Sequence, residues 1–319
     1  MHSSVSTSLR VSRLVVALIF VAVVAACIDW SRTTASAPID IRAYISTVET
    51  MSGVRADFVT GERPAGADDG GPALTANVPA IVLKGGAARV TFTAPTEFSH
   101  VIVAVDGVPG YFDLALGGPT MSADVLIVYA QDVAAPAFWM EFASGNGGGA
   151  GVFASANTAF LGNATGPVQV NVTWNSKADV DLYVVDPRNN EIYYNARGPL
   201  EFGPQGPGPN VGSGTTPTSP AGSPPPGTSG GVLDIDSNAA CSTDGPRAEN
   251  IVWPKRIVPP HGEYTVRVNY WSECGETSTD YVVTVRIKGG DPVIIPGHFD
   301  GKGVGGSSGA GHIVYRFVF

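Results

Sequence analysis

Hydrophobic residues recur from about residue 39 onward in short runs rich in Val, Ile, Phe and Tyr, and turn-forming residues follow each run. Up to about residue 166 the runs are 39–45, 79–83, 89–94, 101–105, 111–116, 125–129 and 138–142. Short β-type runs at spacings of about ten residues predict an all-β sandwich. The continuous apolar run 125–129 fits a buried strand better than one stripe of a helix.

Polar and apolar residues alternate more strictly in the second half of the chain. The alternating segments are 168–174, 264–270, 281–287 and 314–319. Alternation with a period of two is typical of antiparallel strands that bury one face and leave the other in water. We therefore predict two β-sandwich domains, 39–166 and 167–319, and a chain of 319 residues is long enough to bury two cores.

The segment 203–231 has neither pattern. It consists almost entirely of Pro, Gly, Ser and Thr and contains no charged residue. Such a segment cannot bury enough apolar surface to become ordered. An interdomain linker is the obvious interpretation, but strand-like acidic segments that belong together lie on both sides of it. We therefore predict a disordered insertion within the C-terminal domain.

The N-terminal residues are typical of an export signal. Arg10 and Arg13 precede the apolar stretch 14–26, which is too short to span a membrane and has the length of a signal-peptide core. The stretch ends in Val-Ala-Ala-Cys27, which resembles a bacterial lipobox. An ordinary cleavage site followed by an incidental Cys is the alternative.

The lipobox predicts how the chain is processed and where it resides. We expect a signal peptide at residues 1–26, a lipid on Cys27 and a tether at 28–38. Lipid chains hold a protein to a bilayer without spanning it. Ile28 follows the lipidated Cys where an Asp would favour the inner membrane, so we predict a lipid-anchored protein of the bacterial cell envelope, in the outer membrane.

Two cysteines remain in the exported part, Cys241 and Cys274. In an oxidising compartment the simplest assignment is one disulfide between them. A metal-binding pair is the alternative, although neither Cys has a second Cys or a His at the spacing of zinc sites. The formal net charge of −9 argues against a nucleic-acid partner.

Acidic and amide side chains fall at every second position in two strand-like segments. Residues two apart on a strand point to one face, and Ca²⁺ takes about 6–8 oxygen ligands. The pattern therefore predicts a Ca²⁺ site formed by Asp179, Asp181, Asp234, Asp236 and Asn238, with Glu249 as a further ligand. The alternative is that these side chains cap loops by hydrogen bonding to nearby backbone N–H groups. Without a cation, neighbouring carboxylates would repel one another.

Other motifs carry less information. The segment that begins at Asp234 lacks the Gly and Glu that an EF-hand loop requires, because Ala239 and Gly245 occupy those positions. Two matches to Gly-x-Ser-x-Gly, at 227–231 and 305–309, lie in Gly/Ser-rich sequence and not between a strand and a helix, which argues against a hydrolase nucleophile. Aromatic residues at 174, 253, 270 and 271 fit a sandwich core better than a sugar-stacking surface.

Several motifs follow one another in the C-terminal half. They are Trp174, ADVDLYVVDP at 178–187, GGVLDID at 230–236, Cys241, Gly245-Pro246, Glu249-Asn-Ile251, GEYTVRVNY at 262–270 and Cys274. In this order they resemble the YfaP-like domain of unknown function of bacterial exported proteins, over about residues 167–319. Two extra residues, Arg247 and Ala248, and the long insertion depart from that pattern. The resemblance implies a jelly-roll-like β-sandwich and no catalytic residues.

These features together predict a non-enzymatic, lipid-anchored envelope protein. Its C-terminal sandwich would be a binding or adhesion module for a protein or glycan, stabilised by Ca²⁺, because loops at the end of a sandwich are a natural binding surface. A structural scaffold of an envelope complex is the alternative, and an accessory protein of a secreted hydrolase is a third.

Overall fold

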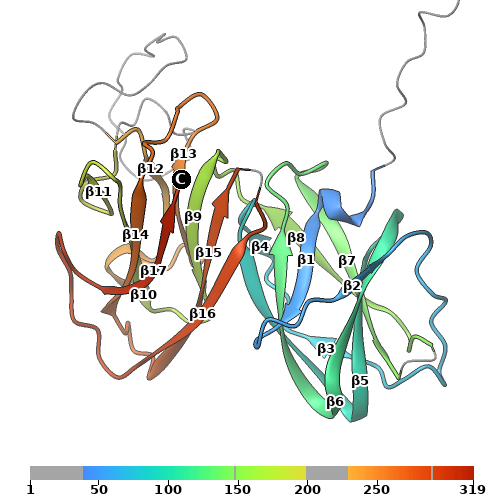
Figure 1. Cartoon of the computed structure of the whole chain (residues 1–319). Coiled ribbons are helices and arrows are strands. Elements are labelled where there is room, and N and C mark those ends of the chain that lie inside the picture. Colours follow the sequence, from blue (N-terminus) through green and yellow to red (C-terminus); the bar gives the residue numbers. More distant parts are fainter. Residues whose placement is uncertain (1–38, 147–148, 199–228, 289) are drawn as a thin grey trace, which may run out of the picture. The chain divides into compact units, whose positions relative to one another are not determined.

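The computed structural model describes residues 39–146, 149–198, 229–288 and 290–319 (Figure 1). The predicted signal peptide, the lipidation site at Cys27, the tether and residues 203–228 of the predicted insertion lie outside these ranges. Strands make up most of the described part, which confirms the all-β prediction. None of the helices in these ranges is long and apolar enough to cross a membrane.

The strands before residue 161 belong to one eight-stranded sheet. They are β1 (Ile45–Thr50), β2 (Asp57–Val59), β3 (Thr75–Ala76), β4 (Ile81–Val82), β5 (Ala87–Val105), β6 (Val108–Tyr129), β7 (Ala137–Gly145) and β8 (Ala154–Phe160). The main order is β1-β6-β5-β7-β8-β4, with β2 paired to β6 and β3 to β5. All pairs are antiparallel except β4–β8, which is parallel.

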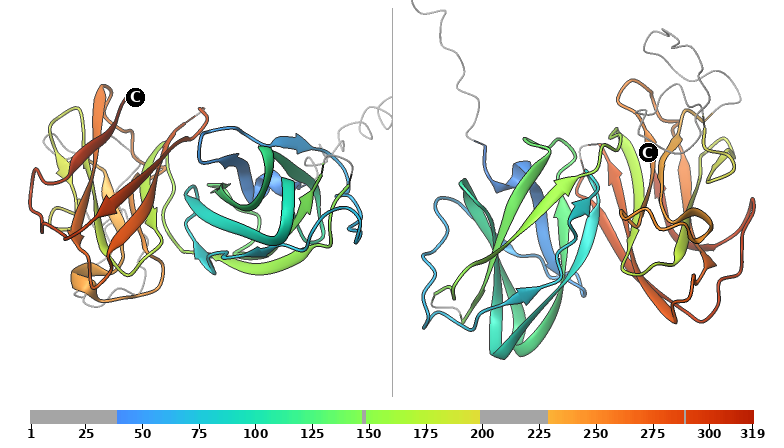
Figure 2. Two further views of the ribbon diagram at one scale, coloured as in Figure 1. Left: turned by 90° about the horizontal axis from the view of Figure 1, so that it is seen from below. Right: turned by 180° about the vertical axis from the view of Figure 1, so that it is seen from behind.

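Two long strands let this single sheet enclose a core. The predicted runs 89–94 and 101–105 both lie in β5, and 111–116 and 125–129 both lie in β6. The pairing register shifts between Thr93 and Phe98, and a shift of this kind bends a strand and increases its twist. The sheet curls around an apolar cluster that includes Val90, Phe92, Phe112 and Leu114 (Figure 2).

The first predicted strand, 39–45, is wrong for most of its length. Residues Ile41–Ala43 form a short 3-10 helix, η1, and β1 begins only at Ile45. The side chain of Asp40 accepts a hydrogen bond from the backbone N–H of Arg42 at 2.9 Å. Such a local cap offers the backbone an alternative to a strand ladder, which hydrophobicity alone does not reveal.

The strands after residue 167 form two facing sheets. They are β9 (Val168–Trp174), β10 (Asp179–Val185), β11 (Glu191–Ile192), β12 (Val232–Asp236), β13 (Ala248–Trp253), β14 (Glu263–Ser272), β15 (Ser278–Ile287), β16 (Val293–Asp300) and β17 (His312–Val318). One sheet has the order β12-β13-β9-β15-β16 and the other β11-β10-β14-β17. All their pairs are antiparallel, and one apolar cluster takes side chains from both sheets, as a sandwich requires.

The second face of β9 is also buried, although the alternation predicted that it would meet water. Its polar side chains pack against residues of the first sheet, and the contacts group residues 39–319 in one compact unit. Gln169 Nε2 donates to the carbonyl of Lys84 at 2.9 Å. From β15, the guanidinium of Arg286 donates to the carbonyls of Gly85 and Tyr129, both at 2.7 Å. Alternation indicates which side chains are polar, but it does not show what covers them.

Candidate metal centre

Strand β10 carries two of the predicted ligands on the face that points away from the apolar core. Val180 and Leu182 belong to the core cluster, and Asp179 and Asp181 alternate with them. Residues on the outer face of a sheet usually meet water. Here, however, Asp179 and Asp181 are only 2% and 3% exposed. Neighbouring loops cover them, so their charges have lost most of their hydration.

Asp179 is held through one oxygen and left free at the other. The backbone N–H of Ala240 donates to its Oδ2 at 2.7 Å, whereas Oδ1 has no hydrogen-bond partner among the described residues. Burial, with added repulsion from Asp181 and Asp236, raises the pKa of Asp179 from 3.8 to about 7. A buried oxygen without a donor costs free energy, so this position favours a cation or a proton.

Asp181 has two weak donors on one oxygen. Tyr183 Oη lies 3.3 Å from its Oδ2, and the amide of Asn269, the residue opposite Asp181 in the β10–β14 ladder, lies 3.5 Å away. Burial raises its pKa to about 6, and the charge of Asp236 adds to this, against the opposing effect of the two hydrogen bonds. Two long hydrogen bonds replace only part of the hydration that a carboxylate loses on burial.

Glu249 reaches the same region from the other sheet. It lies on β13 and shares a face with Ile251 and Trp253, so it points between the sheets. Its Oε2 accepts a hydrogen bond from the backbone N–H of Leu182 on β10 at 2.7 Å. Its Oε1 has no partner in the part of the chain that the structure describes. Complete burial, with repulsion from Asp236 and Asp181, raises the pKa of Glu249 well above its usual value.

Asp236 and Arg197 lie beside Glu249. Asp236 is directly opposite Glu249 in the β12–β13 ladder, so the two carboxylates share a face. Arg197 Nη1 lies 2.7 Å from Asp236 Oδ2. The side chain of Arg197 is 39% exposed and that of Asp236 only 9%. This ion pair therefore lies where the acidic cluster comes nearest to solvent.

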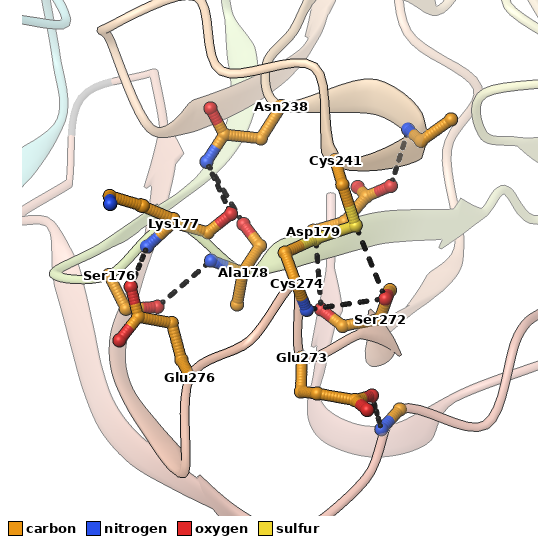
Figure 3. The surroundings of a disulfide bond; sticks show 12 residues. Ser176, Lys177, Ala178, Asp179, Asn238, Cys241, Ser272, Glu273, Cys274 and Glu276 are labelled. Carbon is orange, nitrogen blue, oxygen red and sulfur yellow. Dashed lines mark hydrogen bonds between the residues drawn. A yellow bond between two sulfur atoms is a disulfide. The ribbon is translucent and has the colours of Figure 1, made fainter.

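Asn238 covers the start of β10. Its Nδ2 donates to the carbonyls of Ala178 and Lys177, at 3.0 and 3.3 Å (Figure 3). Its Oδ1 is buried and has no partner among the residues described. An amide oxygen is a common Ca²⁺ ligand, because this ion prefers hard oxygen donors. We call the five residues Asp179, Asp181, Asp236, Asn238 and Glu249 the acidic cluster.

The predicted disulfide is confirmed and anchors the loop that covers the cluster. Cys241 and Cys274 are bonded, with their Cα atoms 5.4 Å apart, and Cys241 ends the short helix η3 (Ala239–Cys241) (Figure 3). Several non-glycine residues of this region have positive φ angles: Asn238, Ala240, Cys241, Arg247 and Cys274. Such backbone costs free energy and persists only where the surroundings impose it. The disulfide supplies one such constraint beside Asp179.

Asp234, which the alternation predicted as a ligand, does not join the acidic cluster. The register of the β12–β13 ladder shifts between Leu233 and Ile235, so Asp234 is the extra residue of a β-bulge. Its side chain accepts from the backbone N–H of Ala164 at 2.5 Å and from Asn250 Nδ2 at 2.6 Å. Asn250 alternates with Glu249 along β13, so these two side chains lie on opposite faces.

The structure thus brings Asp179, Asp181, Asp236, Asn238 and Glu249 together and places Asp234 apart. Outside the undescribed stretches, no group of three or more His, Cys, Asp and Glu side chains is arranged as a metal site. A bound cation would have to draw the free oxygens together. Sequence reasoning missed Arg197, Tyr183 and Asn269. Two of them carried a signal. Tyr183 is the next alternate residue after Asp181, and Asn269 lies on a predicted strand that can pair with the Asp179–Asp181 segment.

Most of the aromatic residues that the sequence singled out lie in the sandwich core, and a surface histidine pairs with acids. Trp174, Trp253 and Tyr270 are buried in the core of the sandwich. His298 bonds the carboxylates of Asp280 and Asp300 at 2.7 and 2.9 Å on the surface. These contacts account for Trp174, Trp253, Tyr270 and His298 without a ligand.

Comparisons with known proteins add little. No protein-family model and no curated protein matches the chain, so the resemblance to the YfaP-like domain stays a prediction. Among solved structures, the chain is similar to the MSCRAMM ACE of Enterococcus faecalis, which is described as binding its ligands by a collagen hug model. The identity is 7%, the match covers 76% of this chain and 98% of that chain, and the TM-score is 0.16. A TM-score this low supports no argument about this chain.

Proposed function

We propose that the chain is a Ca²⁺-binding module of the bacterial cell envelope, non-enzymatic and anchored by a lipid on Cys27. One observation supports the Ca²⁺ site above all others. The acidic cluster contains three buried oxygens without a hydrogen-bond donor among the described residues, Oδ1 of Asp179, Oδ1 of Asn238 and Oε1 of Glu249. Each such buried oxygen lowers the stability of the folded state unless a proton or a cation provides a partner.

The composition of the acidic cluster favours Ca²⁺ over other cations. All its candidate ligands are carboxylate or amide oxygens, which suit hard cations, whereas zinc and copper sites prefer His and Cys. Ca²⁺ accepts irregular coordination, but Mg²⁺ requires near-octahedral geometry and gives up its water reluctantly. A cluster built from two sheets and a disulfide-anchored loop provides irregular coordination.

The export features extend this proposal to location and partner. An exported chain meets the millimolar Ca²⁺ of many extracellular fluids, and extracellular modules bind Ca²⁺ with dissociation constants of about 10⁻⁴–10⁻³ M. The loop 237–245 contacts the cluster and lies at the surface, so Ca²⁺ would order a surface that binds a protein or glycan. The acidic balance disfavours nucleic acid as the partner.

The test is a thermal unfolding scan of the oxidised full chain in EDTA and again in millimolar Ca²⁺. A ligand that binds only the folded state stabilises it, by about 2.7 kcal/mol at 100 times its dissociation constant. We expect Ca²⁺ to raise the melting temperature of the wild type and of Asp234→Asn, but not of Asp236→Asn. The two acids are two residues apart on one strand, so each variant is the control for the other.

Two results would contradict the proposal. If Ca²⁺ leaves the wild-type melting temperature unchanged, the carboxylates only cap loops, and the scaffold alternative gains support. If Asp236→Asn keeps the full Ca²⁺ response of the wild type, Ca²⁺ binds somewhere other than the acidic cluster. Millimolar Mg²⁺ serves as the ionic-strength control, and we expect it to have a much smaller effect.

A further inference from the structure

Arg197 occupies the edge of the acidic cluster. Its guanidinium pairs with Oδ2 of Asp236 at 2.7 Å, while the inner carboxylates Asp179 and Glu249 each keep an oxygen without a donor. A guanidinium carries one positive charge, so it offsets only one of the four carboxylates of the cluster. The ion pair therefore balances the charge of Asp236, the acid nearest to solvent, and leaves the carboxylates of Asp179 and Glu249 without a cation.

The backbone holds Arg197 in this place. The N–H of Leu233, at the start of β12, donates to the carbonyl of Arg197 at 2.9 Å. The next residue, Gly198, has φ of +82°, and a Cβ there would collide with the carbonyl oxygen of Gly231. The chain thus runs tightly against β12, which keeps the guanidinium within reach of Asp236. Its partial exposure leaves it room to turn towards water.

We propose that Arg197 is a built-in competitor of Ca²⁺ that sets the affinity of the acidic cluster. This inference rests on the Ca²⁺ site of the proposed function. Ca²⁺ and the guanidinium compete for the same oxygen of Asp236, and two cations a few ångströms apart repel each other. Ca²⁺ binding exchanges one cation for another, as the guanidinium moves out to solvent. In the absence of Ca²⁺, Arg197 reduces the repulsion among the carboxylates and so stabilises the folded state.

The competition gives the site a threshold. Without Arg197, the four carboxylates would be occupied by Ca²⁺ even at low Ca²⁺ concentrations, because affinity rises with the number of ligand charges. A resident cation lowers the affinity, so that the site responds to the higher Ca²⁺ concentrations found outside cells. An arginine is suited to this role because a guanidinium forms strong, directional hydrogen bonds with a carboxylate.

The experiment is calorimetric titration of Ca²⁺ into the full-length wild type and three variants, Arg197→Gln, Arg197→Lys and Lys255→Gln. We expect Arg197→Gln to bind Ca²⁺ about tenfold or more tightly than the wild type. Arg197→Lys keeps the charge and should stay within about threefold of the wild type. Lys255 pairs with Asp132 elsewhere in the chain, so Lys255→Gln removes the same charge at a distance and should leave the affinity unchanged.

A second readout separates competition from a purely structural role. In EDTA, Arg197→Gln should melt below the wild type, because the repulsion that Arg197 offsets returns. In saturating Ca²⁺ the two should melt at similar temperatures, because the guanidinium has then already left Asp236. A variant that is only misfolded would melt low in both conditions and would bind Ca²⁺ more weakly.

Each outcome decides between the two proposals. If the wild type binds Ca²⁺ and Arg197→Gln binds it equally or more weakly, Arg197 orients Asp236 and the competitor role is overturned. If only Arg197→Gln binds Ca²⁺, the competition is confirmed in a stronger form. If no variant binds Ca²⁺, both the proposed function and this inference fail.

Discussion

The two faces of the β12–β13 ladder both carry buried acids, but the acids differ in their hydrogen-bond partners. On the outer face, Asp234 accepts hydrogen bonds from Ala164 and Asn250, and Asn250 in turn accepts one from Gln169. On the inner face, Glu249 has one backbone donor and one oxygen without any partner among the described residues. The first arrangement is complete as a structural network, whereas in the second Arg197 pairs with Asp236 and Glu249 keeps an oxygen without a partner among the described residues.

Burial and pKa alone do not separate these faces. Burial raises the pKa of Asp234 to about 6, although hydrogen bonds from Ala164 and Asn250 oppose the shift, and the pKa of Asp181 also rises to about 6. A perturbed pKa therefore marks both a structural acid and a candidate ligand. What distinguishes them is the hydrogen-bond balance of each oxygen and the presence of neighbouring negative charge.

Removal of the disulfide should have the largest effect. The loop closed by Cys241 and Cys274 spans 33 positions, and the chain-entropy model gives a loss of about 3–4 kcal/mol for the double Ser variant. The acidic cluster should also lose Ca²⁺ affinity, because the loop supplies Asn238 and the N–H of Ala240. Denaturant unfolding and calorimetry measure the two effects, and unchanged Ca²⁺ affinity would show that the loop does not shape the site.

Replacement of Asp234 by Ala should destabilise the outer face with or without Ca²⁺. The N–H of Ala164 and the amide of Asn250 would lose an acceptor, and an orphaned buried donor costs about 1–3 kcal/mol. The unfolding free energy in urea, measured in EDTA and in Ca²⁺, should fall by the same amount in both. A loss confined to Ca²⁺ conditions would instead place Asp234 among the ligands.

The metal-free acidic cluster should make stability depend on pH. The folded pKa of Asp179 is about 7 and that of Asp181 about 6, both above the ordinary value of 3.8. The folded state therefore holds protons that the unfolded chain has released, so stability in EDTA should fall as pH rises from about 4 to about 7. Urea unfolding across this range checks the slope, which saturating Ca²⁺ should reverse.

A variant identifies the source of that slope. Asp179→Asn keeps the shape of the side chain and removes its charge, so the fall in stability between pH 4 and 7 should become shallower. Asp234→Asn removes the buried acid of the outer face, whose pKa is also raised to about 6, so the two variants divide the slope between Asp179 and Asp234. A slope that Asp179→Asn leaves unchanged would mean that the acidic cluster does not control the pH response.

The sequence predicts most of the framework of this site, for identifiable reasons. Alternation along 179–185 and 281–287 predicted strands that the structure contains, because the period of two is a property of the local chain. The same rule placed Asp234 beside Asp236 and was wrong, because a β-bulge changes the face of one residue. A bulge depends on how two strands pair, and one strand's pattern does not contain that information.

The parts that escaped prediction depend on tertiary contacts. Arg197 pairs with an acid 39 positions away in the chain, so no spacing rule links them. The positive φ of Ala240 is unfavourable for the isolated residue and is imposed by its loop. In the first sheet, the merging of four predicted runs into β5 and β6 likewise depends on pairing between distant residues.

Replacement of Tyr183 by Phe should give the smallest effect and sharpen the boundary of the acidic cluster. Tyr183 Oη donates to Asp181 Oδ2 at 3.3 Å, a long hydrogen bond, so its loss should cost about 0.5–1.5 kcal/mol in EDTA. Ca²⁺ affinity should hold or rise slightly, because the carboxylate oxygen becomes free for the ion. If Tyr183→Phe instead abolishes the Ca²⁺ response as Asp236→Asn does, the hydroxyl itself belongs to the coordination shell. The acidic cluster would then extend along β10 beyond Asp181, towards the aromatic stack of Tyr183 and Tyr193.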